Sequence, residues 1–245
     1  MKILVRVLAV LLVCIFASFS NVVAEKAETG LVGHWSFDDV DGKIVKDSSG
    51  SGNDGTLMET AKVVKGGILG RALSMDGKGY VEVPSHTSLE NQEFTISFWM
   101  KTDDHTAKMN GGISKGLVFG DPTSYEYEIF ITDDICRLSI SNGTQHSLSS
   151  ALDRINDNNW HLWTAVVGPK SMKLYRDGIQ RRGSQARVCR GDPSKKLIID
   201  YSKHYAFYIG GSRFQLKGLI DEVRIYNRAL TGEEIKKYYD DCFYE

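Results

Sequence analysis

The residues between Trp35 and Tyr208 follow a strand pattern, and this pattern constrains the fold more than any other feature of the chain. Short segments of alternating apolar and polar residues are separated by glycine-rich turns, and no helical periodicity continues beyond a turn or two. In residues 94–101 (FTISFWMK) every second side chain is apolar and defines one face. Patterning of this kind is typical of a β-sandwich. We therefore expect an all-β protein with two packed antiparallel sheets.

Two later segments indicate how neighbouring strands connect. Residues 160–167 (WHLWTAVV) are largely apolar on both alternating faces, which is typical of a central strand that is covered on both sides. Asp177 and Gly178 form a dipeptide that favours a tight hairpin turn between residues 172–176 and 179–181. These segments predict a meander of adjacent strands.

Residues 218–241 (GLIDEVRIYNRALTGEEIKKYYDD) change from a period of two to a helical period. Val223 and Ile225 share one strand face, as in a half-buried strand. Thr231 followed by Glu234 matches a capping box, in which each residue bonds the backbone of the other. A terminal strand and then a short C-terminal helix are expected.

This C-terminal stretch resembles the signature of laminin-G-like domains in the concanavalin A-like lectin and glucanase superfamily. The same order of blocks continues through almost the whole chain. These blocks are residues 30–39 (GLVGHWSFDD), 47–57 (DSSGSGNDGTL), 70–84 (GRALSMDGKGYVEVP), 94–101, 160–167 and 174–178 (LYRDG). The resemblance implies a two-sheet antiparallel jelly-roll sandwich of the concanavalin A-like kind, closed by a short C-terminal helix.

The first residues have the pattern of an export signal. Lys2 and Arg6 precede an apolar run over residues 7–19, which is too short to favour a spanning helix. We expect residues 1–24 to be a signal peptide cleaved after Ala24; cleavage after Ser20 and an uncleaved anchor are the alternatives. Residues 25–245 then form one jelly-roll domain. The mature chain is expected to be secreted, extracellular or at the cell surface, or else periplasmic, without a membrane span.

Charge and the resemblance together define the expected partners. The formal net charge is -1 and 25% of the residues are charged, which argues against general binding to polyanions such as nucleic acid. The resemblance implies an extracellular carbohydrate or protein ligand. A domain with a purely structural role in adhesion is a further alternative.

Three cysteines remain after the expected cleavage. Cys136 shares a strand face with Leu138, which indicates a buried thiol. Cys189 and Cys242 are then free to form a disulfide, which an exported chain favours, although their separation in sequence does not fix their distance. No Cys-x-x-Cys spacing indicates a zinc site.

The sequence lacks the carboxylate pattern of the superfamily's glucanases. Glucanases of this superfamily typically carry both catalytic carboxylates on one strand, in an E-x-D-x-x-E motif. The segment of this sequence most similar to that motif contains Glu126 and Glu128, which alternation places on one strand face. Nucleophile-elbow, phosphate-loop and His-Glu-x-x-His motifs are also absent from the sequence. We expect a non-catalytic protein; the alternative is a degenerate or unrecognised glycoside hydrolase that uses these two glutamates.

Two groups of residues are candidates for ligand binding. Tyr125, Tyr127 and Phe214 have rings that can stack on a sugar, with strand packing as the alternative. Arg187 and Arg190 lie in a basic stretch over residues 181–196 that can attract acidic glycans; a solvated loop is the alternative.

Four aspartates suggest a calcium ion. Alternation places Asp39 at the end of the first strand and Asp221 at the start of the last, both on the inward face. The resemblance implies that these strands are antiparallel neighbours, which brings the two carboxylates together. Asp47 and Asp54 can add oxygen ligands from the glycine-rich loop, and calcium takes six to eight oxygens. In the alternative, Asp221 accepts backbone N–H bonds or pairs with an arginine, and Asp39 stays solvated.

Overall fold

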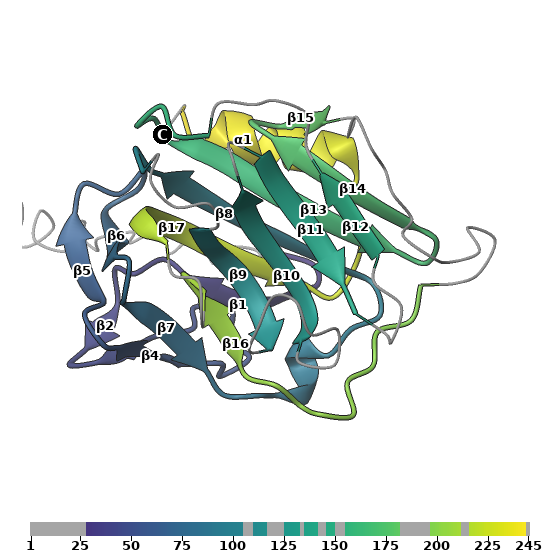
Figure 1. Cartoon of the computed structure of the whole chain (residues 1–245), viewed down its shortest axis with the longest axis horizontal. Coiled ribbons are helices and arrows are strands. Elements are labelled where there is room, and N and C mark those ends of the chain that lie inside the picture. The colour runs from purple at the N-terminus through teal and green to yellow at the C-terminus, as the bar shows by residue number, and fades with distance from the viewer. Residues whose placement is uncertain are drawn as a thin grey trace, which may run out of the picture.

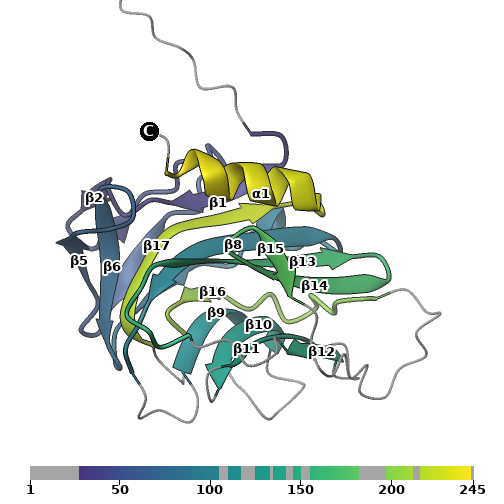
Figure 2. The same ribbon diagram turned by 90° about the horizontal axis from the view of Figure 1, so that it is seen from above.

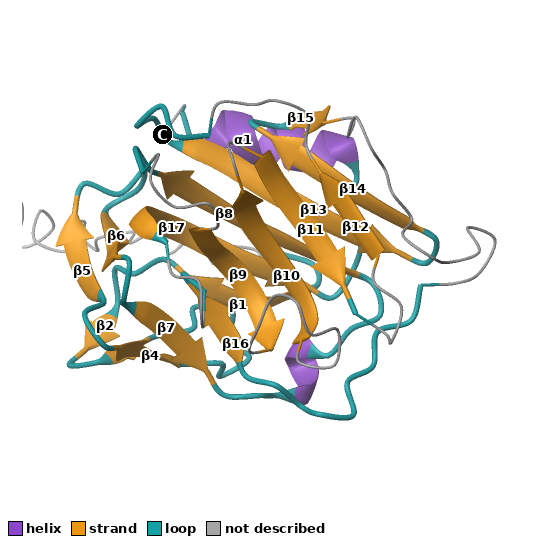
Figure 3. Ribbon diagram, viewed as in Figure 1, coloured by secondary structure: helices purple, strands orange, loops and turns teal. Residues whose placement is uncertain are grey.

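The chain folds into two antiparallel sheets that pack face to face, as Figure 1 and Figure 3 show. The structure is a computed structural model that describes residues 28–104, 110–116, 125–132, 135–141, 146–149, 155–181, 197–211 and 216–243. The expected two-sheet jelly-roll sandwich is confirmed. The predicted signal peptide lies outside the described residues.

The first sheet has eight strands among the described residues. Its order is β15 (Ile179–Arg181), β14 (Ser171–Arg176), β13 (His161–Gly168), β8 (Phe94–Lys101), β17 (Lys217–Tyr226), β6 (Arg71–Asp76) and β5 (Lys62–Lys65), with β1 (Leu31–Trp35) also paired to β17. The expected meander is present in β13, β14 and β15. Asp177 and Gly178 have φ angles of 54° and 73°, so both adopt the left-handed conformation that a two-residue hairpin requires.

The second sheet has nine strands in the part of the chain that the structure describes. Its order is β12 (His146–Ser149), β11 (Ile135–Ile140), β10 (Tyr125–Thr132), β9 (Asn110–Gly116), β16 (Phe207–Ile209), β7 (Tyr80–Val83), β4 (Gly55–Met58), β3 (Ile44–Val45) and β2 (Val40–Asp41). In Figure 1 this sheet lies in front of the eight-stranded sheet, so the view looks onto its outer face. A short 3-10 helix, η1 (Thr87–Leu89), follows β7.

Helix α1 (Gly232–Asp241) closes the fold as predicted. Thr231 accepts a hydrogen bond from the Glu234 backbone, and the Glu234 carboxylate accepts one from the Thr231 backbone at 2.8 Å, which confirms the capping box. Ile235 packs on Val166, and Tyr239 stacks on Trp99 with ring centroids 5.7 Å apart. The helix therefore covers the outer face of the eight-stranded sheet, as Figure 2 shows.

The main core lies between the inner faces of the two sheets. Trp35 is fully buried, stacks on Phe207 with centroids 5.4 Å apart, and donates a hydrogen bond from Nε1 to the Asn53 carbonyl at 2.9 Å. Because this tryptophan joins the two sheets and a loop, it fixes how the layers sit on each other. No helix among the described residues is long and apolar enough to cross a membrane.

Of the two predictions made for the cysteines, the burial of Cys136 is confirmed. Cys136 is buried, as expected. Cys242 is a free thiol in the structure, so the predicted disulfide with Cys189 is not formed there; Cys189 itself lies outside the described residues.

Candidate ligand-binding face

One in-register row of side chains crosses the outer face of the nine-stranded sheet, and we call it the outer row. Each member is the direct strand-pairing partner of the next. The outer row consists of Thr56, Glu82, Tyr208, Ser114, Glu128 and Ser139. The six residues come from β4, β7, β16, β9, β10 and β11, so segments far apart in sequence contribute to one line.

Strand alternation orients the outer row away from the core. Phe207 and Ile209 flank Tyr208 and both belong to the hydrophobic core. Tyr127 and Ile129 likewise flank Glu128 and belong to that core. Because α1 covers the other sheet, strands β9, β10 and β11, which carry Ser114, Glu128 and Ser139, lie on the opposite side of the molecule from the helix (Figure 2).

Two adjacent members of the outer row are buried and carry polar atoms without hydrogen bonds. Glu128 is 6% exposed and its Oε1 atom has no partner, and Ser139 is 0% exposed with an unpartnered Oγ atom. Burial raises the pKa of Glu128 to about 7, against the opposing charge of Arg137. An unsatisfied buried polar group costs about 1–3 kcal/mol. The fold therefore retains two groups that a hydrogen-bonding partner would stabilise.

Aromatic side chains lie further along the same face. Tyr80 and Tyr208 make an edge-to-face contact with centroids 5.9 Å apart. Burial, with the nearby Glu82 and Tyr80, raises the pKa of Tyr208 to about 12, so its hydroxyl stays protonated at neutral pH. Ser114 separates Tyr208 from Glu128 in the outer row, and strands about 4.8 Å apart put these two backbones roughly 10 Å apart. Aromatic and hydroxyl groups at this spacing suit a ligand that is partly apolar and partly polar.

Of the residues predicted to contact a ligand, the two tyrosines are described by the structure and both are buried. Tyr127 is 1% exposed and packs on Phe94 with centroids 4.6 Å apart, so the alternative of strand packing describes it. Tyr125 is 4% exposed and lies outside the main core. Phe214, Arg187 and Arg190 lie outside the described residues.

Glu126 and Glu128 do not share a strand face, contrary to the expectation from alternation. The pairing of β10 with β9 shifts between Tyr125 and Tyr127, so a β-bulge includes Glu126. Its carboxylate lies 3.0 Å from Nζ of Lys115, a fully buried side chain, whereas Glu128 faces outward. Burial raises the pKa of Glu126 while Lys115 opposes the rise. The two glutamates consequently have separate environments.

The buried Lys115 joins several segments at this position. Its ammonium donates to Ser85 Oγ at 3.2 Å and to the Tyr205 carbonyl, and it lies 3.5 Å from a carboxylate oxygen of Glu90. Glu90 also accepts from the exposed His204. These contacts connect residues 85–90 and 204–205 to β9. Glu126 is part of the same buried group of charges, because its carboxylate pairs with Lys115.

Asp221 is the one predicted calcium ligand that is fully buried. It is 0% exposed and accepts hydrogen bonds from the backbone of Leu69 at 3.2 Å and of Glu222 at 2.8 Å. Burial raises its pKa to about 8, more than these N–H groups lower it. Glu222 has a φ of 50°, at a point where the pairing of β17 with β8 shifts. The backbone is thus held in an uncommon conformation beside a buried carboxylate.

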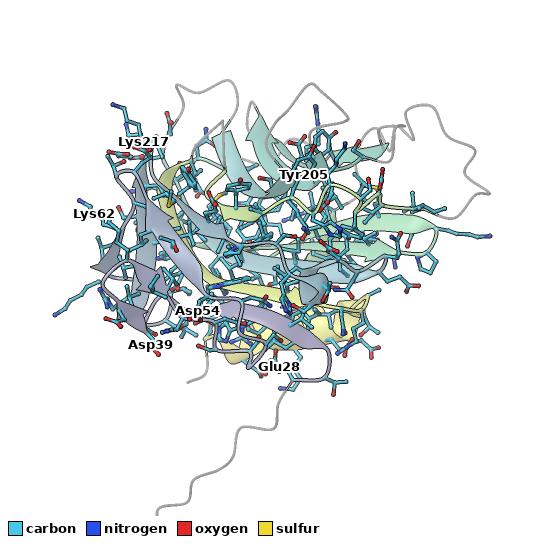
Figure 4. The ribbon with its side chains drawn as sticks, turned by 90° about the horizontal axis from the view of Figure 1, so that it is seen from below. Glu28, Asp39, Asp54, Lys62, Tyr205 and Lys217 are labelled. Atoms are coloured by element: carbon cyan, nitrogen blue, oxygen red, sulfur yellow. The ribbon has the colours of Figure 1, made fainter. Side chains whose placement is uncertain are left out.

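The other three predicted ligands have surroundings of their own. Asp39 is exposed and lies at the rim of the molecule in Figure 4. Asp47 accepts from the His34 and Asn53 backbones, each at 2.9 Å, and Asp54 pairs with Lys46 at 2.9 Å. The backbone hydrogen bonds to Asp221 and the exposure of Asp39 are the features that the alternative describes, while the calcium ion itself stays a prediction. Among the described residues, no group of three or more His, Cys, Asp or Glu side chains converges to hold a metal ion.

Asp38 and Asp221 contact the same segment, residues 67–71. The Arg71 backbone donates to Asp38 at 2.8 Å, and a Cβ atom at Gly70 would collide with the Asp38 carboxylate. A Cβ atom at Gly67 would collide with Oδ2 of Asp221. Both carboxylates therefore line the segment 67–71. Sequence reasoning missed Asp38 because Phe37 has a φ of 61°, which ends the alternation before the aspartates.

The sequence matches a laminin G family model over residues 75–236, and the description of that family is "Concanavalin A-like lectin/glucanases superfamily". The match covers more than half of the chain, so the protein belongs to this family. No match was found among curated protein sequences.

Solved structures with the same fold come from toxins and from enzymes that act on carbohydrates. The binding domain of Paraclostridial mosquitocidal protein 1 aligns with a TM-score of 0.64 at 19% identity, over 87% of this chain and 52% of that one. Domain 4 of AbnA, an extracellular arabinanase from Geobacillus stearothermophilus in complex with arabinotriose, aligns with a TM-score of 0.65 at 21% identity, over 86% and 98%. A Trypanosoma rangeli sialidase aligns with a TM-score of 0.63 at 18% identity, over 86% and 33%. The chain thus spans about half of the toxin domain and a third of the sialidase.

Proposed function

We propose that the protein is an exported, non-catalytic module that binds carbohydrate on the outer face of its nine-stranded sheet. The outer row carries this proposal, because it combines an aromatic contact at Tyr208 with hydroxyl and carboxylate groups at Ser114, Glu128 and Ser139. Sugar sites need both kinds of group, one for the ring face and one for the hydroxyls. The similar domain of AbnA, which is in complex with arabinotriose, supports the same class of ligand.

The arrangement of carboxylates favours binding over hydrolysis. Glycoside hydrolysis uses two carboxyl groups across the scissile bond, at separations of about 5–9.5 Å. Glu126 is paired with Lys115, which leaves Glu82 as the other carboxylate in the outer row with Glu128. Three strand spacings put the backbones of Glu82 and Glu128 roughly 14 Å apart. The alternative hydrolase would release reducing sugar from a polysaccharide, and that release would disappear in Glu128→Gln.

The test is a glycan array on the expected mature chain, followed by a blocking substitution. Ser114 is partly exposed in the middle of the outer row, so Ser114→Trp places a bulky ring across it. Ser74→Trp on β6 of the other sheet is the matched control, because Ser74 is also partly exposed. We expect the Ser114 variant to lose binding and the Ser74 variant to keep it. Equal binding by both variants would remove the outer row from the site.

We also propose a structural calcium ion at Asp221. The support is a buried carboxylate for which no cationic partner is present among the described residues; it lines the segment 67–71, as Asp38 does, and it precedes the strained Glu222. The four-aspartate set does not fit, because Asp47 and Asp54 already bind loop groups and Asp39 is exposed. Backbone carbonyls and water would have to supply most of the six to eight oxygens.

A further inference from the structure

Two tyrosines and a glutamate lie together at one end of the outer row. Glu82 on β7 is the strand-pairing partner of Tyr208 on β16 and of Thr56 on β4. Tyr80 lies two residues before Glu82, so alternation places both on the same face, roughly 7 Å apart along the strand. Met58 pairs directly with Tyr80. We call these five residues the tyrosine patch, and its three strands are neighbours in Figure 1.

Solvent reaches this part of the sheet. Thr56, Met58, Tyr80 and Glu82 are all partly exposed. Tyr208 is 7% exposed, but its hydroxyl is not one of the fully covered polar atoms that lack a partner. That hydroxyl makes no hydrogen bond with a described residue, so it is free to bond a ligand. A ligand can therefore contact both the rings and the carboxylate from the outside.

The charges that act on the two tyrosines are negative. Burial raises the pKa of Tyr80, and the charges of Glu82 and Glu59 raise it further. Burial and then Glu82 likewise raise the pKa of Tyr208 to about 12. Glu82 forms no ion pair with a lysine, arginine or histidine in the part of the chain that the structure describes. The patch thus combines two aromatic rings with a carboxylate that a cationic group on a ligand would neutralise.

This combination ranks three classes of sugar. A tyrosine ring has a negative face, so it attracts a cation as well as the apolar face of a sugar ring. An ammonium group would donate to the Glu82 carboxylate, and such charge-assisted bonds are about twice as strong as neutral ones. A neutral sugar uses the rings without the charge. An acidic sugar would bring its carboxylate against Glu82, and like charges in one site disfavour each other.

We propose that the tyrosine patch is a subsite that selects amino sugars with a free, protonated amine over neutral and acidic sugars. The ring of Tyr80 stacks on the sugar, Glu82 accepts from the ammonium group, and the Tyr208 hydroxyl bonds a sugar hydroxyl. This inference rests on the proposed carbohydrate-binding function. It assigns the charged end of the ligand to β7.

Calorimetric titration with three matched trisaccharides tests this selection. The trimers of glucosamine, N-acetylglucosamine and glucose (cellotriose) share their ring configuration and linkage. They differ in one substituent, which is an ammonium, an acetamide or a hydroxyl. Wild-type protein should bind the glucosamine trimer most tightly at about pH 6, where amines are protonated. This preference should shrink at high salt, since the screening length contracts to about 3 Å at 1 M.

Two variants separate the charge from the stacking. Glu82→Gln keeps the shape of the side chain and removes its charge, so affinity for the glucosamine trimer should fall roughly 5- to 10-fold while affinity for cellotriose stays nearly the same. Tyr80→Leu keeps an apolar side chain without the ring and should weaken binding of all three trimers. The matched control is Glu233→Gln, an exposed position on α1 over the other sheet, which should leave affinity unchanged.

The outcomes separate the subsite from the function. If no trimer and no array glycan binds, both the proposed function and the subsite fail. If an array glycan binds and Ser114→Trp blocks it, but the glucosamine trimer binds no more tightly than cellotriose, only the subsite fails. An equal loss for both trimers in Glu82→Gln would also overturn the subsite. Should Tyr80→Leu fail to fold, Glu82→Gln and the salt series decide the matter.

Discussion

Nζ of Lys115 lies 3.0 Å from Oε2 of Glu126, and the two side chains are 0% and 1% exposed. Lys115 also faces Glu90 at 3.5 Å, so one ammonium balances two carboxylates inside the protein. Breaking a buried pair leaves an uncompensated charge, which is far more costly than the pair itself.

Lys115→Ala should therefore destabilise the domain by about 3–5 kcal/mol, measured by urea unfolding. The control is Lys46→Ala, which removes an exposed pair with Asp54 whose side chains are 41% and 39% exposed. That change should cost at most about 1 kcal/mol. Equal losses in the two variants would contradict the structural role of the buried lysine.

His161 should make stability depend on pH. Its Nδ1 atom lies 2.8 Å from Asp177 and its Nε2 atom 3.1 Å from Asp157. Burial is the largest influence and opposes charging, but the hydrogen bond and charge of Asp177 and the hydrogen bond of Asp157 together outweigh it, so the pKa of His161 is raised. A raised pKa in the folded state contributes stability that is fully present below the ordinary value of about 6.5 and is lost as the pH rises through the folded value.

His161→Gln should accordingly cost more stability at about pH 5.5 than at about pH 8.5. The measurement is the difference in unfolding free energy between wild type and variant at each pH. This difference isolates His161 from Asp221 and Glu128, whose raised pKa values also favour lower pH. A difference that does not vary with pH would show that the histidine gains nothing from its aspartates.

The fold could be predicted from the sequence because its signals lie in short segments, whereas the candidate site could not. The capping box of Thr231 and Glu234 and the Asp177-Gly178 turn depend on neighbours within four residues, so the sequence alone predicts them. The outer row joins Tyr208 to Ser114 and Glu128 by pairing between distant strands. No single-sequence pattern contains that register.

Two errors in the expected site have a common physical cause. Alternation assumes a regular strand, but a bulge at Glu126 turns this glutamate towards Lys115. The left-handed conformation of Phe37 similarly shifts the orientation of Asp38 and Asp39. Both irregularities depend on what the strand packs against, so residue spacing could not reveal them.

Calcium should stabilise the domain through Asp221. If the ion binds only the folded state, a hundredfold excess over its dissociation constant adds about 2.7 kcal/mol. For a domain of this size that is a rise in melting temperature of roughly 5–10 °C. Since calcium must displace the proton that Asp221 holds with a pKa of about 8, the rise should be larger at higher pH.

Thermal unfolding in EDTA and in millimolar calcium measures this rise. Asp221→Asn should abolish it, and Asp39→Asn, a change at an exposed position, should leave it intact. A wild-type midpoint that is indifferent to calcium would remove the site. A shift that survives in Asp221→Asn would place the ion elsewhere.

The location of carbohydrate binding is the central claim, and backbone amide chemical shifts during titration with a glycan that binds test it most directly. The account predicts shifts concentrated in β16, β9, β10 and β11, at Tyr208, Ser114, Glu128 and Ser139, with no change along α1. Shifts concentrated on α1 and the outer face of the eight-stranded sheet, with the outer row unchanged, would contradict it.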